Sequence, residues 1–160
     1  MTSQEENDAS TVSFMRKQLL GACVESFGLY HQVLGIEFRT DAPYEDIFLS
    51  ISSSLTFEPP FALPVTTFSP EEQALLFFSK INLLPITGLD YFPDGSLALT
   101  FANGNRFHIQ SEDDYGEPWQ VGSAAHGWSI IGTTGGGMLF FKSVTAPSAL
   151  ATNEDPAPTG

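Results

Sequence analysis

Residues 84–142 read LPITGLDYFPDGSLALTFANGNRFHIQSEDDYGEPWQVGSAAHGWSIIGTTGGGMLFFK, and they set the fold class of the whole chain. This segment consists of short runs in which apolar and polar residues alternate, separated by glycine, proline, asparagine and aspartate. Alternation with a period of two is typical of strands that bury one face. The segment therefore predicts a series of antiparallel strands joined by tight turns.

Two of these turns are marked by their dipeptides. Asp94-Gly95 and Asn103-Gly104 supply residues that tolerate the positive φ angles of tight hairpins. The run 96–101 between them alternates cleanly and is predicted to be a strand. Further strands are predicted wherever alternation resumes, at residues 86–92, 107–109, 117–121, 128–131 and 138–141.

The first half of the chain predicts strands at residues 22–27, 31–39 and 47–57, after a short helical turn over 15–20. One helix is predicted over residues 69–81. It begins with a capping serine, has proline at its first position and glutamate at its third, and continues with apolar residues at helical spacing. The fold class predicted is α+β, mainly antiparallel β-sheet with one central helix packed on it.

The 160 residues are enough for one domain with a proper core. Residues 1–12 and 143–160 are polar or rich in alanine, proline and acids, without periodicity, so we expect them to be disordered. A single globular domain is predicted over residues 13–142.

An internal duplication is one explanation of the strand pattern. Residues 96–101 can be laid on residues 33–38, and Phe107 of the next strand then falls on Leu49. Two related β-modules would result. The alternative is chance, because short apolar strands resemble one another.

Acidic residues dominate the charge of the chain. Nineteen Asp and Glu face six Lys and Arg, which gives a net charge of −13 and a pI near 4.2. Such a protein repels nucleic acids and anionic membranes and attracts basic partners, although acidity can also serve solubility alone. The N-terminal segment lacks the basic and apolar regions of a signal peptide, and no apolar run is long enough to span a membrane. We expect a cytoplasmic protein that binds neither nucleic acid nor membrane.

The sequence contains no recognisable catalytic or metal-binding constellation. His31, His108 and His126 are not at metal-ligand spacing, and Cys23, the single cysteine, lies in an apolar run. The glycines of residues 132–137 lack the Gly-Lys-Ser/Thr of a phosphate loop, and no serine lies in a Gly-x-Ser-x-Gly turn. We expect no cofactor, no metal and no enzymatic activity.

The densest acidic patch lies in the loop after strand 107–109. It lacks the ligand spacing of a calcium loop, so it is either a solvated loop or a contact surface for a basic partner. Neighbouring aromatic residues resemble those that anchor protein interfaces. The predicted partner-binding residues are His108, Glu112, Asp113, Asp114, Tyr115, Glu117 and Trp119.

The same motifs resemble a family of small bacterial domains known as DUF6188. The matching residues are Asp94-Gly95, Leu97, Leu99, Phe101, Asn103-Gly104, Tyr115, Glu117, Trp119 and Gly136-Gly137 before residues 138–141. The chain departs from the family pattern by inserting Gly116, by placing Pro118 before the tryptophan, and by having phenylalanine in place of a closing tryptophan. The resemblance implies a compact β-rich fold without established enzyme activity, and small acidic domains of this style look like immunity proteins of bacterial toxin systems.

Three functional hypotheses follow. The first is an acidic protein-binding module, in its specific form an immunity protein that neutralises a basic toxin by occlusion. The second is a small-ligand-binding or enzymatic domain with a pocket lined by Trp119, Trp128 and His108. The third is a domain that assembles with itself through an exposed sheet edge.

Overall fold

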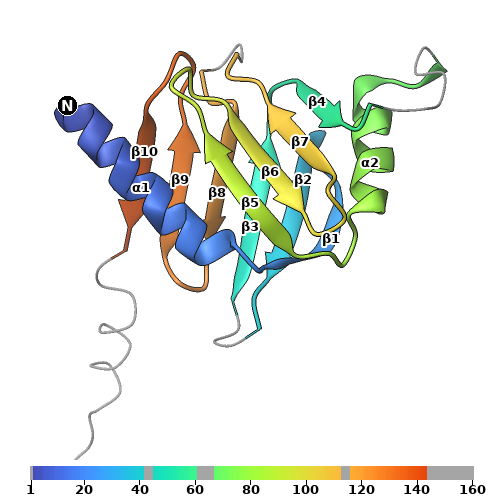
Figure 1. Cartoon of the computed structure of the whole chain (residues 1–160), viewed down its shortest axis with the longest axis horizontal. Coiled ribbons are helices and arrows are strands. Elements are labelled where there is room, and N and C mark those ends of the chain that lie inside the picture. The colour runs from blue at the N-terminus through green and yellow to red at the C-terminus, as the bar shows by residue number, and fades with distance from the viewer. Residues whose placement is uncertain (1, 42–44, 61–66, 113–115, 144–160) are drawn as a thin grey trace, which may run out of the picture.

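Strands make up most of the structure, a computed structural model that describes residues 2–41, 45–60, 67–112 and 116–143. Within these ranges two antiparallel sheets lie face to face, with one helix along each side of the smaller sheet (Figure 1). The elements in chain order are α1 (Ser3–Leu19), β1 (Cys23–Tyr30), β2 (Val33–Arg39), β3 (Asp46–Ile51), β4 (Leu55–Glu58), α2 (Pro70–Lys80), β5 (Ile86–Tyr91), β6 (Leu97–Phe101), β7 (Arg106–Ile109), β8 (Trp119–Ser123), β9 (Trp128–Gly132) and β10 (Met138–Lys142).

The larger sheet, sheet A, has the strand order β1-β2-β3-β8-β9-β10, and the smaller one, sheet B, has the order β4-β7-β6-β5. The alternating apolar residues of both sheets point into the space between them, where Phe38, Leu99 and Phe107 are fully buried. Met15 of α1 and Phe78 of α2 close the sides of this core. The predicted α+β class with mainly antiparallel sheet is confirmed.

A second helix, α1, replaces the disordered lead that the sequence predicted over residues 1–12. Thr2 and Glu5 form a capping box at its start. Thr11, Met15 and Leu19, spaced by four residues, are the positions that α1 buries. The rest of the helix is polar, so its apolar periodicity is weak in the sequence. The helix packs against β5 and β10, which are distant from it in the sequence.

The strand predicted over residues 47–57 is two strands in two different sheets. β3 ends at Ile51 in sheet A, and β4 begins at Leu55 in sheet B. The serines between them, residues 52–54, carry the chain from one sheet to the other. The shift of alternation at this point in the sequence therefore marks a crossing and not a continuous strand.

The chain contains two repeats with the same topology. Each has a helix, a three-stranded meander in one sheet, and a fourth strand that joins the other sheet. β4 leaves the first repeat to pair with β7, and β8 leaves the second to pair with β3. The registers also match, because Ile36 faces Leu49 in the first repeat and Leu99 faces Phe107 in the second.

Hydrogen bonds at the junction between the repeats come in equivalent pairs. The N–H of Gly21 donates to the carbonyl of Ile86 at 2.9 Å, and the N–H of Leu83 donates to the carbonyl of Val24 at 3.0 Å. Gly21 and Leu83, which follow α1 and α2 respectively, both have positive φ angles, of 90° and 65°. Leu83 thus adopts the same left-handed conformation as the glycine at the equivalent position of the first repeat.

We predict that Leu83→Gly raises the free energy of unfolding, measured by urea denaturation. A left-handed non-glycine residue costs about 1–2 kcal/mol, and the flexibility of glycine returns part of that gain, so the expected increase is about 0.5–1 kcal/mol. Leu83 is 66% exposed and has little packing to lose.

The matched control is Gly21→Ala at the equivalent position. No atom lies within 4 Å of the added Cβ, so only the backbone conformation opposes the alanine. A loss of about 1 kcal/mol is expected. If Leu83→Gly were instead destabilising, the leucine side chain would have a packing role that its exposure hides.

Candidate functional site

Several connections between strands meet at one end of the sandwich, which we call the loop end (Figure 1). It consists of residues 52–54, 92–96, 110–112, 116–118 and 132–137. The antiparallel order produces this gathering, since β3, β5, β7 and β9 all run towards the same end.

Hydrogen bonds hold these connections together. The N–H of Thr134 donates to the carbonyl of Gly116 at 3.0 Å. The hydroxyl of Ser53 donates to the carbonyl of Glu112. The loop end is therefore built from loops that support one another.

Trp119 supports the loop end from the core side. The sequence predicted it to be an exposed contact residue, whereas the structure buries it. Its side chain is 1% exposed, and its indole Nε1 donates to the carbonyl of Gly95 at 3.0 Å. The ring lies against Gly132, where a Cβ atom would come within 2.3 Å of it. Trp119 thus holds the turn at residues 93–95 against the core and is unavailable to a partner.

Carboxylates from several elements surround the loop end. The first turns of α1 adjoin it, since Glu5 and Asp8 line a hollow of about 460 Å³ together with Pro93 and Gly136. The first turn of α2 borders the serines of residues 52–54 across a second hollow of about 490 Å³. The acidic residues at this end are Glu5, Asp8, Glu71, Asp94, Glu112 and Glu117.

All six basic residues of the chain lie elsewhere. Three belong to the last turns of α1 and α2, and three stand at the strand termini that point away from the loop end. They are Arg16, Lys17, Lys80, Arg39, Arg106 and Lys142. The basic residues are therefore absent from the loop end, whereas acidic residues occur at both ends of the molecule.

The arginine side chains form ion pairs with carboxylates of two strands. Arg39 contacts Glu25 at 3.1 Å, and Arg106 contacts Asp90 at 3.2 Å. Arg16 also approaches Asp90, at 3.9 Å. Arg39 thus pairs with an acid near the opposite end, whereas Arg106 and Arg16 reach Asp90, the next-to-last residue of a strand that runs towards the loop end.

Tyr91 shows the electrostatic effect of the acidic end. Burial raises the pKa of its hydroxyl, and the nearby charges of Asp8 and Asp94 raise the pKa further. The N–H of Gly137 donates to this hydroxyl at 2.8 Å and opposes the shift. Asp94 itself has a lowered pKa, because the hydroxyl and the N–H of Ser96 donate to its Oδ1 at 2.6 and 2.9 Å.

The structure brings together part of the predicted partner-binding set. Glu112 and Glu117 are exposed at the loop end. The predicted residues Asp113, Asp114 and Tyr115 lie outside the described residues. Glu5, Asp8, Glu71 and Asp94 also lie at this end but were not predicted to do so, although acids in a first helical turn and in a Pro-Asp-Gly turn are signals that group them with the loop.

His108 lies on the outer face of sheet B, as predicted, because its neighbours Phe107 and Ile109 are buried in the core. The ring of Phe92 covers it at 5.0 Å, and its Nε2 atom is buried without a hydrogen-bond partner in the described structure. Its charge lies close enough to Asp94 to lower the pKa of that carboxyl.

The pocket expected between Trp119, Trp128 and His108 does not form. Both tryptophans point into the sandwich, where they are 1% and 5% exposed, whereas His108 points away from it. The three side chains lie on opposite sides of sheet B and line no common cavity. This correction removes the observation that supported a small-ligand or enzymatic domain.

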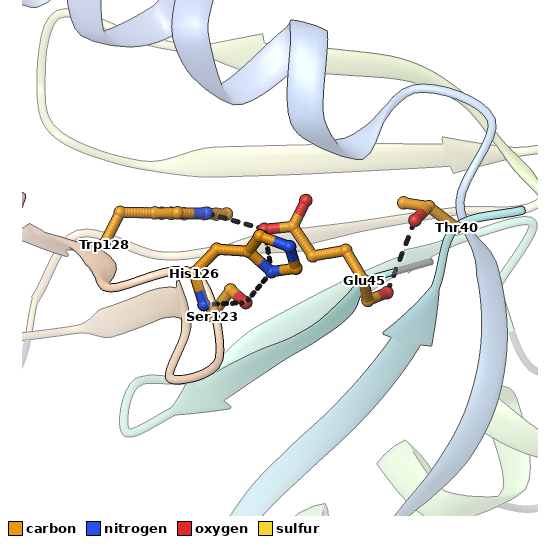
Figure 2. A network of polar contacts seen from close by, with 5 residues as sticks. All are labelled: Thr40, Glu45, Ser123, His126 and Trp128. Carbon is orange, nitrogen blue, oxygen red and sulfur yellow. Dashed lines mark hydrogen bonds and ion pairs between the residues drawn. The ribbon is translucent and has the colours of Figure 1, made fainter. Parts of the chain in front are cut away.

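A second polar cluster lies at strand termini that point away from the loop end. Figure 2 shows its five residues from close by. Glu45 is 7% exposed, and its Oε1 accepts a hydrogen bond from Trp128 Nε1 at 2.8 Å. The Nδ1 atom of His126 lies 3.4 Å from the same oxygen and 3.3 Å from the hydroxyl of Ser123. These contacts join the turn between β8 and β9 to the connection between β2 and β3.

This combination of serine, histidine and glutamate is not arranged as a catalytic triad. A triad needs the carboxylate on one ring nitrogen and the nucleophile on the other. Here Ser123 and Glu45 both face Nδ1 of His126, and Ser123 is 1% exposed. The cluster has a structural role.

Comparisons with protein-family models, with curated proteins and with solved structures found no match. Among the described residues, no group of three or more His, Cys, Asp or Glu is placed to hold a metal ion. Neither described helix has the length and apolar character that crossing a bilayer requires. The absence of basic residues from the acidic loop end is therefore the feature on which a functional assignment can be built.

We predict that Glu45→Ala lowers the free energy of unfolding by about 1–3 kcal/mol, because the buried indole N–H of Trp128 loses its acceptor. Urea denaturation measures this loss. His126→Ala is the control: its side chain is 45% exposed, and an exposed ion pair contributes about 0–1 kcal/mol. Equal losses in both variants would mean that the histidine contact, and not the indole bond, stabilises the cluster.

Asp94 gives a pH-dependent prediction. Its folded-state pKa is lowered, so its charge stabilises the fold at neutral pH, and this contribution disappears as the pH falls through that lowered pKa. Asp94→Asn keeps a hydrogen-bond acceptor but does not titrate. The stability difference between the wild type and this variant should shrink below about pH 4, as measured by denaturation at a series of pH values. A difference that stays constant down to pH 2 would contradict the assigned shift.

Proposed function

We propose that this chain is a protein-binding module that binds a basic protein surface through its loop end. The observation that supports the proposal is the absence of all six Lys and Arg from an end that collects acids from two helices and several loops. An acidic surface without basic residues steers an oppositely charged partner towards it and raises the association rate.

The breadth of the acidic surface favours a protein partner over a metal ion. The carboxylates come from separate elements and surround two shallow hollows, and they do not converge on one point. A protein with several basic side chains can meet such a surface at many places at once. In its specific form the proposal is an immunity-type protein of the bacterial cytoplasm that neutralises a basic toxin by covering its active surface.

The test is co-expression with the product of the neighbouring gene, followed by affinity capture at low and at moderate salt. Capture that weakens with added salt is expected, because exposed charge pairs are screened. If the partner is a toxin, its activity should fall when the complex forms. A failure to capture the neighbouring product, or a basic protein from the native lysate, at low salt would overturn the proposal.

Matched charge reversals test the location of the contact. Asp8→Lys/Glu112→Lys changes the loop end, and Asp41→Lys/Glu58→Lys makes the same change in net charge on exposed residues away from it. The first pair is expected to slow association about tenfold or more, measured by surface plasmon resonance at low salt, because it reverses the steering field. The second pair should change the rate about twofold. Equal effects would show that net charge alone, and not the loop end, drives binding.

A further inference from the structure

The outer face of sheet A is left uncovered by the described elements. Its inner face meets sheet B and the two helices, which all lie on the same side of it (Figure 1). The outward positions of adjacent strands form continuous rows across the sheet. The residues of this outer face that matter here are Tyr30, Phe48, Ser50, Gly122, Leu139 and Phe141.

Large apolar side chains stand exposed on this face. Tyr30 is 40% exposed, Phe48 36%, Leu139 47% and Phe141 53%. The solvent face of an antiparallel sheet ordinarily alternates to polar residues. In the two central rows, which pass through Phe48 and Ser50, Glu37 is the only charged residue. Of the 19 acidic residues in the chain, only Glu37 lies in these two rows.

A hollow lies in the middle of the face. Phe48, Gly122 and Ser129 are neighbours in one row, and the missing side chain of Gly122 leaves a space beside the Phe48 ring. The cavity is about 400 Å³ and is also lined by Ser50 and Ala124. A Cβ on Gly122 would come within 2.6 Å of the Trp128 carbonyl, so the hollow is fixed by the backbone. It can receive an aromatic side chain from outside.

The second repeat shows that the fold does not require an apolar outer face. Arg106 of sheet B occupies the position that Phe48 occupies in sheet A, since each directly precedes a matched buried residue of the third strand. In the same way Asp90 stands where Gly28 stands. Arg106 and Asp90 pair with each other at 3.2 Å. Equivalent positions therefore carry an ion pair in the second repeat and a glycine and a phenylalanine in the first.

We propose that the outer face of sheet A is a self-association surface that takes a second copy of this chain. The net charge of −13 opposes association of two copies through any acidic surface. This face, nearly free of charge, lets two copies meet without bringing carboxylates together, and a closed two-fold dimer uses the same patch on both copies. The Phe48 or Phe141 ring of one copy fills the hollow at Gly122 of the other.

The size of the face sets the strength of the dimer. From β2 to β10 the strands cover about 20 Å, and five residues of each strand cover about 17 Å. The face therefore covers about 340 Å², which is smaller than the roughly 800 Å² that each partner buries in a standard interface. The expected dimer is therefore weak and forms in the micromolar range or above.

Sedimentation equilibrium of the full chain between about 10 µM and 1 mM tests the proposal. A reversible monomer–dimer equilibrium is expected, and it should strengthen as salt is raised from low to moderate, because salt screens the repulsion between two acidic chains. This trend is opposite to that expected for a basic partner at the loop end. The two proposals can therefore fail separately.

Phe48→Arg introduces on this face the residue type that Arg106 has at the equivalent position of the second repeat. This substitution should raise the dimer dissociation constant at least tenfold. Phe141→Arg, at the exposed edge, is a second variant with the same expected direction. Thr56→Arg adds the same charge to an exposed site on sheet B and should leave the dissociation constant unchanged. Urea denaturation confirms that each variant folds. A wild type that stays monomeric at 1 mM in moderate salt, or a dimer unaffected by both phenylalanine substitutions, would overturn the proposal.

Discussion

The exchange of one strand between the two sheets is the constraint on which the rest of the structure depends. β4 completes sheet B beside β7, and β8 enters sheet A beside β3. Without its partner, each three-stranded meander would leave an unpaired edge and an open apolar face. The hydrogen bonds that join residues 21–24 to residues 83–86 repeat the same two-fold relation at the opposite end. The two repeats therefore depend on each other, and neither has a complete core alone.

This exchange also creates the loop end. Both crossings between the sheets, at residues 52–54 and between β7 and β8, occur at the end where the turns after β5 and β9 also lie. A crossing leaves the ladder and cannot contribute to the core, so its side chains are free to be polar. Acids can accumulate there without a cost in packing, while Arg39 and Arg106 remain at the strand termini that point away, paired with Glu25 and Asp90.

The sequence predicted those features whose physical cause is local. The Asn103-Gly104 hairpin, with Gly104 at a φ of 86°, and the helix capped by Ser69 depend on neighbouring residues alone. The position of α1 depends on partners that are distant in the sequence, so its largely polar residues predict disorder where the structure has a helix. Trp119 was misplaced for a different reason. Its alternation with Val121 indicates a side chain that points inward, whereas its proximity in sequence to the acidic loop favours a contact residue.

The site was predictable only in part, because its charges are brought together by topology. Glu112 and Glu117 were found as neighbours in sequence, whereas Asp8 reaches the same end through α1. The two repeats also allow the outer faces of the two sheets to be compared. They share a register, but only sheet A carries the β9–β10 hairpin, which widens the face that lacks charge. Because the acidic end and this uncharged face use different residues, the two proposed contacts, with a basic partner and with a second copy of the chain, do not compete for the same surface.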